Sequence, residues 1–89
     1  MNSLLAASFR DDFRDLPEDV QALARQVYRL WRQNPYHNSF RFKRVSQKYP
    51  YYSVRVGAHW RAVGEKIGNT IVWFWIGPRA EYDGLLRQL

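Results

Sequence analysis

Residues 52–76 read YSVRVGAHWRAVGEKIGNTIVWFWI, and three strand patterns follow one another in this stretch. Side chains alternate over residues 52–56 with the two-residue period of a β-strand. A Gly-Ala pair predicts a turn before a return strand over residues 60–66, and a Gly-Asn pair predicts a tight hairpin after it. Residues 70–76 are the most apolar run and predict a central strand. The stretch therefore predicts an antiparallel sheet.

The predicted central strand has two faces. Strict alternation gives one face Val72, Phe74 and Ile76, and gives the other face Ile71, Trp73 and Trp75. Since one face of the sheet must be covered by helices, Trp73 and Trp75 are candidates for an open face. An uncovered aromatic face on a small domain usually marks a binding surface. The alternative is that residues 80–89, which favour a short helix, fold back over it.

The N-terminal half has helical periodicity. Apolar residues at positions 9, 13 and 16 share one helical face, and Ser8 is the predicted N-cap of this first helix. Pro17 fits the first turn of a second helix, which continues to about residue 33 and ends before an Asn-Pro pair. Residues 1–7 are consistent with an edge strand or a frayed start, and residues from about 39 to 45 alternate as a strand does.

In order, these segments predict an α+β fold, in which an N-terminal helical hairpin packs on an antiparallel β-sheet meander, with a short C-terminal helix as an option. Eighty-nine residues make one domain, 1–89. The chain has no Cys, and its two His and eight carboxylates follow no recognisable ligand spacing, so we expect no metal or other cofactor. No secretory pattern and no long apolar run is present, which favours the cytoplasm and no membrane partner.

Charge is distributed unevenly along the chain, whose formal net charge is +6. No acidic residue occurs between Asp19 and Glu65, whereas nine cationic and nine aromatic side chains occur there. Such a surface attracts a polyanion, and nucleic acid is the commonest one. Aromatic faces add surfaces on which unstacked bases can lie. The alternative is that the aromatic residues form the core and the cations are simply solvated.

Residues 52–63 and 69–79, with Tyr82 soon after, resemble the RelE/ParE superfamily of bacterial toxins, and RelE/HigB-like members in particular. The shared elements are a Tyr-x-Val-Arg-Val-Gly strand, an aromatic-Arg pair that opens the next strand, and a last strand that ends in Ile-Gly-x-Arg. Their order and spacing carry the resemblance, which spans about residues 8 to 84.

The resemblance implies the toxin of a type II toxin–antitoxin module. RelE-like members are metal-independent endoribonucleases that cut mRNA on the ribosome and so inhibit translation. ParE-like members instead inhibit DNA gyrase and have no nuclease activity, and an inactive relic would act only with its antitoxin in operon repression. The implied partners are a cognate acidic antitoxin, mRNA and the ribosome, and operator DNA through the antitoxin complex.

The resemblance also implies roles for individual residues. The residues expected to be catalytic are Arg55, Arg61, Arg79 and Tyr82. Those expected to bind RNA or phosphate are Arg41, Lys43, Lys48 and His59. Those expected to bind the antitoxin are Trp73 and Trp75.

One departure from the RelE pattern concerns charge. RelE has a Lys at the position of Ser53, and a serine cannot supply that charge. Arg41, Lys43 or Lys48 are candidates to replace it from a neighbouring strand or loop, and His59 is a candidate proton shuttle. For the arginines the alternative is structural: Arg61 could bond Glu65 or a backbone carbonyl, and Arg79 could pair with Glu81 or Asp83.

Overall fold

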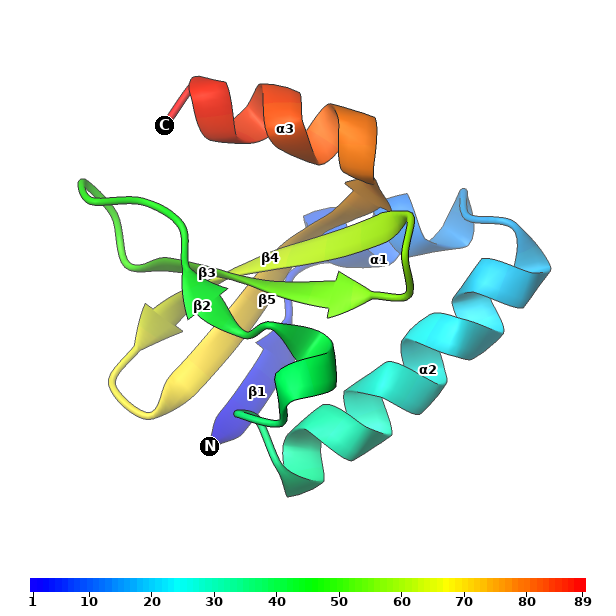
Figure 1. The fold of residues 1–89 in the computed structure, drawn as a ribbon, viewed down its shortest axis with the longest axis horizontal. Helices are drawn as coiled ribbons and strands as arrows, with labels where there is room; N and C mark the ends of the chain where they lie inside the picture. Colours follow the sequence, from blue (N-terminus) through cyan, green and yellow to red (C-terminus); the bar gives the residue numbers. More distant parts are fainter.

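The computed structural model describes all of residues 1–89. Its elements, in chain order, are β1 (Asn2–Leu5), α1 (Ala7–Arg14), α2 (Glu18–Gln33), the 3-10 helix η1 (Asn38–Phe40), β2 (Lys43–Arg44), β3 (Tyr51–Val56), β4 (Trp60–Ile67), β5 (Thr70–Pro78) and α3 (Arg79–Arg87). The sheet lies between α2 and α3 (Figure 1). None of the helices is long and apolar enough to cross a membrane.

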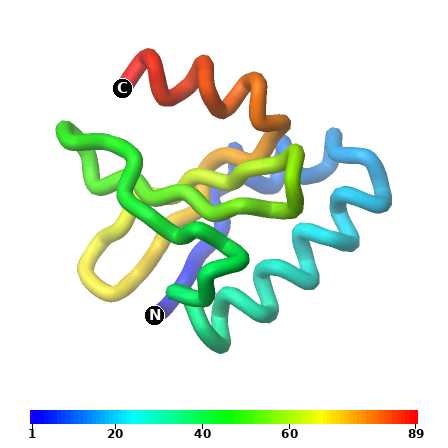
Figure 2. Tube along the Cα trace, in the orientation of Figure 1, coloured from blue at the N-terminus to red at the C-terminus, as the bar shows by residue number.

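The predicted α+β architecture is confirmed. The five strands lie in the order β1-β5-β4-β3-β2, and β2 to β5 form an antiparallel meander. The edge strand β1 pairs parallel to β5, so the N-terminal residues are a strand rather than a frayed start. Figure 2 shows the N-terminus beside the end of α2 and the C-terminus beyond the other side of the sheet.

The first helix begins differently from the prediction. Ser8 is not its N-cap, because α1 begins at Ala7 and Ala6 precedes it without a capping side chain. The Ser8 hydroxyl instead donates to the carbonyl oxygen of Phe74 at 2.7 Å, which fastens α1 to β5. The predicted strand near residue 40 is also shorter than expected. Phe40 belongs to η1 and is 6% exposed, and only Lys43–Arg44 pairs with β3.

A bulge changes the faces predicted for β5. Val63 pairs with Trp75 and Gly64 pairs with Trp73, so Phe74 is an extra residue in β5. Trp73 therefore faces α2, where its ring meets Trp31 at 5.2 Å, whereas Trp75 lies on the opposite face, 6.4 Å from the ring of Tyr82. The expectation that both tryptophans share one open face is wrong, because the bulge interrupts the alternation between them.

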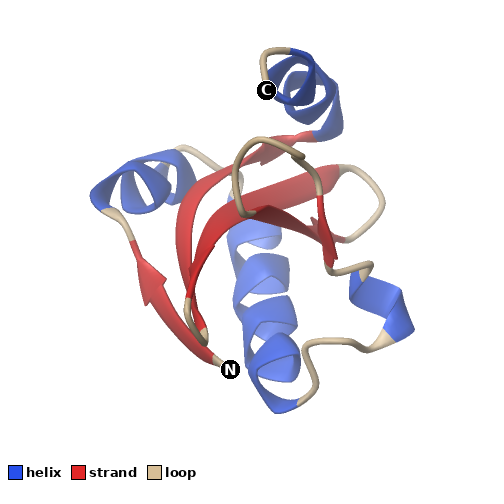
Figure 3. Cartoon of the chain, turned by 90° about the vertical axis from the view of Figure 1, so that its left-hand side faces the viewer, coloured by secondary structure: helices blue, strands red, loops and turns tan.

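The core lies between the sheet and the two N-terminal helices. Trp31 of α2 is 1% exposed, and Ile71 of β5 is fully buried. The turn between the helices is fastened by Gln21, whose side chain donates to the carbonyl oxygens of Phe13 and Leu16. The hairpin is confirmed, but α1 lies along β5 while α2 crosses behind the sheet (Figure 3), so its two arms diverge.

Candidate functional site: an arginine cluster and an apolar groove

The first feature is a pair of arginines that oppose each other across two strands. Arg55 of β3 is the direct partner of Arg61 of β4. Directly opposed residues of antiparallel strands point to the same face, which here is also the face of Ser53 and Trp75, hereafter the α3 face. Like charges in this arrangement destabilise a sheet. A fold that keeps such a pair is typical of a binding or catalytic site.

The turn between the two strands draws these side chains together. Arg55 Nε and Arg61 Nη1 both donate to the carbonyl oxygen of Gly57, at 3.1 and 3.2 Å. Arg61 Nη1 also donates to the carbonyl oxygen of Trp60 at 2.7 Å. Gly57 has φ +68°, and a Cβ there would lie 2.8 Å from Leu23 Cδ2, so this position requires glycine. A backbone turn therefore holds two guanidinium groups side by side.

Two further arginines surround this pair. The backbone N–H of Arg79 donates to the carbonyl oxygen of His59 at 2.9 Å, which fixes the start of α3 beside the β3–β4 turn. Burial, and then the charges of Arg79 and Arg55, lower the pKa of Arg61 below its ordinary value, with a smaller contribution from Arg41. Arg41 is the one non-glycine residue with positive φ, at 47°. Backbone strain of this kind clusters at functional sites. We call Arg41, Arg55, Arg61 and Arg79 the arginine cluster.

No carboxylate neutralises the arginine cluster. The only ion pair in the chain joins Arg14 to Asp11 on α1. Arg79 is not paired with Glu81 or Asp83, and Arg61 bonds backbone carbonyls rather than Glu65. Backbone carbonyls are neutral and do not cancel the charge of a guanidinium group. The cluster therefore produces a strong positive electrostatic potential on the α3 face.

Tyr82 lies beside the cluster but is buried. Its side chain is 7% exposed, and its hydroxyl lies 2.9 Å from the hydroxyl of Ser53, which is 2% exposed. Ser53, the residue that departs from the RelE pattern, therefore joins β3 to α3. Tyr82 also covers Trp75, so the C-terminal helix folds back over this part of the face, as one of the two alternatives expected.

The remaining cations predicted to bind RNA are placed differently from one another. Lys43 of β2 is the direct partner of Ser53, so it lies on the α3 face one strand away from the cluster. Lys48 lies in the loop before β3, at the other end of that strand from Arg55, and its ammonium lies 5.3 Å from the ring of Tyr49. His59 is exposed in the β3–β4 turn. Lys43 and His59 adjoin the cluster, and Lys48 does not.

No three His, Cys, Asp or Glu side chains are close enough to hold a metal ion.

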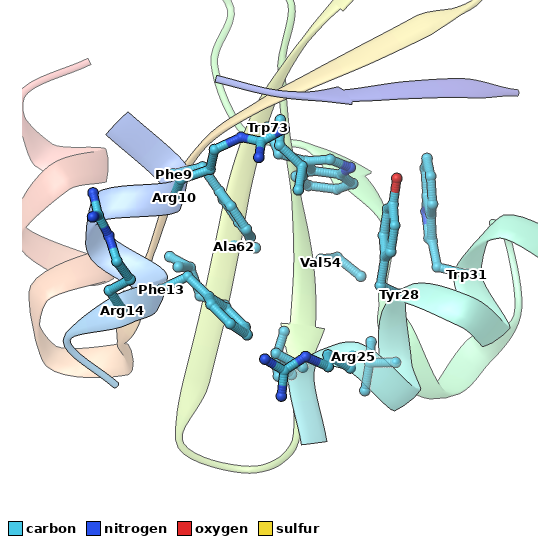
Figure 4. A pocket seen from close by; sticks show the side chains of 15 residues that line it. Phe9, Arg10, Phe13, Arg14, Arg25, Tyr28, Trp31, Val54, Ala62 and Trp73 are labelled. Carbon is cyan, nitrogen blue, oxygen red and sulfur yellow. The ribbon is translucent and has the colours of Figure 1, made fainter. Parts of the chain in front are cut away.

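The second feature is an apolar groove between α1 and α2, with the sheet as its floor (Figure 4). The groove has a volume of about 590 Å³. Apolar side chains line most of it, among them Phe9, Phe13, Val27, Tyr28, Trp31 and Trp73. Arg10 and Arg14 on α1 and Arg25 on α2 lie at its walls. The groove was not predicted from the sequence, because the two helices were expected to pack side by side and cover this face of the sheet.

Two unpaired donors line the groove. The indole nitrogens of Trp31 and Trp73 are buried and have no hydrogen-bond partner. Trp73, predicted to lie on an open face for the antitoxin, is 3% exposed and lines this groove. Buried polar groups without a protein partner are rare in native proteins, so these two N–H groups are donors that a molecule in the groove can use.

Comparison with known proteins places this geometry in a family. The model of the ParE-like toxin domain matches residues 18–84. The fold is similar to a chain of the RelB–RelE antitoxin–toxin complex of Methanococcus jannaschii, with 20% identity, a TM-score of 0.72, and coverage of 92% of this chain and 96% of that one. It is also similar to a chain of the toxin–antitoxin complex RelBE2 of Mycobacterium tuberculosis, with 16% identity, a TM-score of 0.67, and coverage of 88% and 96%.

The isolated RelE toxin of E. coli has the same fold, with 13% identity, a TM-score of 0.63, and coverage of 99% of this chain and 98% of that one. No curated protein sequence matches the chain significantly. The three structures share the fold at low identity, whereas the family model matches most of the chain. The protein therefore belongs to the ParE-like toxin domains of the RelE/ParE superfamily.

Proposed function

We propose that this toxin is a ribosome-dependent endoribonuclease that cuts mRNA without a metal ion. The observation that carries the proposal is the pair Arg55 and Arg61, directly opposed across the sheet, bonded to the same carbonyl oxygen and in an ion pair with no carboxylate. A protein keeps such repulsion where an anion relieves it. The phosphate of a nucleic acid backbone is an anion that two guanidinium forks bind through several oxygens at once.

The proposed reaction is an internal phosphoryl transfer. The ribose 2′-oxygen attacks the adjacent phosphorus and loses its proton, and the bond from phosphorus to the 5′-oxygen of the next nucleotide breaks as that oxygen gains a proton. Arg61 and Arg79 stabilise the charge that develops on the phosphorane, and Arg55 supplies a second cation. His59, exposed beside Arg79, is the accessible candidate for moving a proton, whereas Tyr82 needs α3 to shift before its hydroxyl meets RNA.

The burial of Tyr82 also supports a second candidate function. Because its hydroxyl lies against Ser53, the free chain presents the arginine cluster without an accessible Tyr82 phenol. A cluster of cations whose tyrosine is covered suits binding rather than catalysis, as in a gyrase inhibitor. Inhibited gyrase would produce DNA breaks and leave transcripts whole.

One experiment separates the two functions. The chain is expressed from an inducible promoter, and transcript ends and DNA breaks are mapped after growth stops. Messenger cut within codons, in the absence of DNA breaks, is the expected result. Arg61→Gln should abolish the cuts while the protein remains folded. Arg29→Gln removes an exposed arginine of α2 outside the cluster and should leave the cuts in place. Intact messenger in arrested cells would reject the nuclease function.

We also propose an acidic antitoxin partner and assign it to the groove rather than to the tryptophan face expected from the sequence. The M. jannaschii and M. tuberculosis structures are toxin–antitoxin complexes, which supports a partner of this class. The groove offers apolar walls for the apolar side of a helix, and Arg10 and Arg25 on opposite walls for its carboxylates. Trp73 contributes from the floor of the groove.

The antitoxin assignment is tested by co-expression of the toxin with acidic antitoxin candidates from the genes beside its own. Arg10→Glu combined with Arg25→Glu should release the antitoxin in a pull-down. The matched charge reversal at Arg29 and Arg87, two exposed arginines that do not line the groove, should leave the complex intact. Equal capture of both double variants would place the antitoxin elsewhere.

A further inference from the structure

Three aromatic rings lie on the α3 face near the end of β3 away from the arginine cluster, and the buried pair Ser53 and Tyr82 lies between them and the cluster. The ring of Tyr51 lies 5.0 Å from that of Phe74 and 5.1 Å from that of Tyr49. The rings of Tyr49 and Tyr51 are close to parallel, at 20°. Tyr49 is exposed, and the other two rings are half-buried. We call these three residues the aromatic strip.

The bulge in β5 explains how the strip extends beyond one strand. Because Phe74 is the extra residue between Trp73 and Trp75, both Phe74 and Trp75 lie on the α3 face. Trp75 is covered by Tyr82, whereas Phe74 meets Tyr51 across β4. The bulge thus adds an aromatic ring to this face instead of to the core.

The loop before β3 holds the far end of the strip in place. Arg44 Nε donates to the carbonyl oxygen of Ser46 at 2.8 Å, and the Ser46 hydroxyl accepts from the backbone N–H of Lys48 at 3.2 Å and of Tyr49 at 3.1 Å. Ser46 is 8% exposed. This arrangement places the ammonium of Lys48 beside the ring of Tyr49. A cation and a flat ring at one position suit a phosphate and its base.

We propose that the aromatic strip is a stacking platform for bases of the RNA whose scissile phosphate lies at the arginine cluster; the assignment to the substrate rests on the proposed function. Tyr51 and Arg55 are four residues apart on one strand, which is about 13 Å. A nucleotide next to the scissile one can therefore lay its base on Tyr51, and the following base can reach Tyr49. Aromatic side chains bind bases in this way without requiring a particular sequence.

Charge gives the RNA an orientation on this face. Lys43 on β2 and Lys48 in the loop lie on the outer side of β3, so the phosphates follow that side. Glu65 pairs directly with Tyr51 from the inner side and is the one carboxylate in this part of the sheet. It repels phosphate, but it can accept a hydrogen bond from the amino group of a base. The bases therefore point inward, toward Tyr51 and Phe74.

The test compares two oligomers of equal length and charge. One is a fluorescent single-stranded RNA, and the other carries the same sugar–phosphate chain with abasic residues. The wild-type chain should bind the RNA at least about five-fold more tightly than the abasic chain, which corresponds to one stacked base. Tyr49→Leu combined with Tyr51→Leu should remove this preference without changing the affinity for the abasic chain. Tyr36→Leu, at a tyrosine that is 65% exposed outside the strip, should keep the preference.

Each outcome decides the proposal. Loss of preference in the strip variant, with unchanged thermal unfolding, supports it. The proposal is overturned if the wild-type chain has no preference for the RNA, or if the strip variant keeps that preference. Loss of antitoxin binding by the strip variant would not rescue it, because the strip would then be a contact for a protein and not for bases. If the protein is not a nuclease, transcripts in arrested cells remain intact, and this is measured in the separate expression experiment. That outcome does not alter the result of the binding test. Arg61→Gln should lower the affinity for both oligomers by the same factor.

Discussion

At the residue scale, the arginine cluster combines recognition with a cost in stability. Burial and neighbouring cations lower the pKa of Arg61, so its charged form is less favourable in the folded chain than in the unfolded one. Arg55 opposes it directly and bonds the same carbonyl. The cluster is thus positioned before any anion arrives, and the anion is expected to relieve the repulsion.

We predict that Arg55→Thr stabilises the free protein and weakens its activity. Threonine suits a strand and removes the repulsion with Arg61, which is worth about 0.2–1 kcal/mol for a directly opposed pair. The free energy of unfolding, measured with urea, should rise, while the rate of the proposed mRNA cleavage should fall about ten-fold or more. Arg29→Thr on α2, where no opposed cation is relieved, should not stabilise the protein. A less stable Arg55→Thr chain would show that the lost bond from Arg55 Nε to the carbonyl oxygen of Gly57 outweighs the relieved repulsion.

Asp12 gives a second prediction, which concerns pH. Burial raises the pKa of Asp12 above 3.8, although its carboxylate accepts a hydrogen bond from the backbone N–H of Ile76 at 3.4 Å. The folded chain therefore binds this proton more tightly than the unfolded chain, and stability is lost as pH rises from 3.8 through the folded pKa.

Asp12→Asn keeps an oxygen acceptor and removes the charge. Its melting temperature should exceed that of the wild-type chain at pH 7 by a small amount, because the partly exposed carboxylate is screened by water. The difference should vanish at pH 3. Asp83→Asn on the exposed side of α3 serves as the control. A lower melting temperature for Asp12→Asn would mean that the bond to Ile76 outweighs the burial.

At the element scale, β5 shows what periodicity can and cannot predict. Strands β3, β4 and β5, the two turns with glycine and the two N-terminal helices follow from patterns of period 2 and 3.6, because those patterns reflect which side of an element is buried. The bulge does not, since one extra residue leaves the local pattern apolar on both faces. Ile76, and not Trp75, shares the core face with Trp73. This could be recognised only from the register in which β5 pairs with β4.

Other element-level differences have the same origin. Ser8 has the chemistry of an N-cap, but a carbonyl of β5 lies within its reach, and that partner is distant in sequence. Arg55, Arg61 and Arg79 could be expected together from the resemblance that the Val-Arg-Val, Trp-Arg and Gly-x-Arg motifs carry, and Arg41 only as a candidate from a neighbouring strand or loop. The groove could not, because the angle between α1 and α2 depends on how each helix packs on the sheet.

Gly64 at the bulge gives a prediction for this element. A Cβ at Gly64 would lie 2.6 Å from Ile71 Cγ2 and 3.1 Å from the carbonyl oxygen of Val72, and the backbone cannot move away cheaply. Gly64→Ala should therefore destabilise the fold by about 1–3 kcal/mol. Gly84→Ala in α3 meets no atom within 4 Å and should instead stabilise the protein by about 0.5–1 kcal/mol. Chemical denaturation of both variants measures the contrast, and a neutral Gly64→Ala would show that the bulge can relax.

At the scale of the whole molecule, charge is the dominant property. The chain has a net charge of +6 and a single internal ion pair. Self-repulsion of this kind weakens the compact state and falls when salt screens it. The same screening weakens binding to a polyanion. Stability and RNA affinity should therefore respond to salt in opposite directions.

We predict that raising the salt concentration increases the melting temperature of the free chain and lowers its affinity for single-stranded RNA. The logarithm of the binding constant should fall linearly with the logarithm of salt concentration, and Arg61→Gln should reduce that slope by about 0.7, the value for one phosphate contact on a single strand. Arg29→Gln should leave the slope unchanged. A slope unaffected by Arg61→Gln would remove this arginine from the RNA contact.

The groove gives the protein an intrinsic optical signal. Trp31 and Trp73 are packed edge to face at its floor, and neither indole N–H has an acceptor. Any helix that enters replaces solvent with protein groups next to both fluorophores, so their emission should shift. Neutralisation of the toxin could thus be followed in real time without a label, against the constant emission of Trp60 and Trp75 outside the groove, and the shift should disappear when Trp31→Phe is combined with Trp73→Phe.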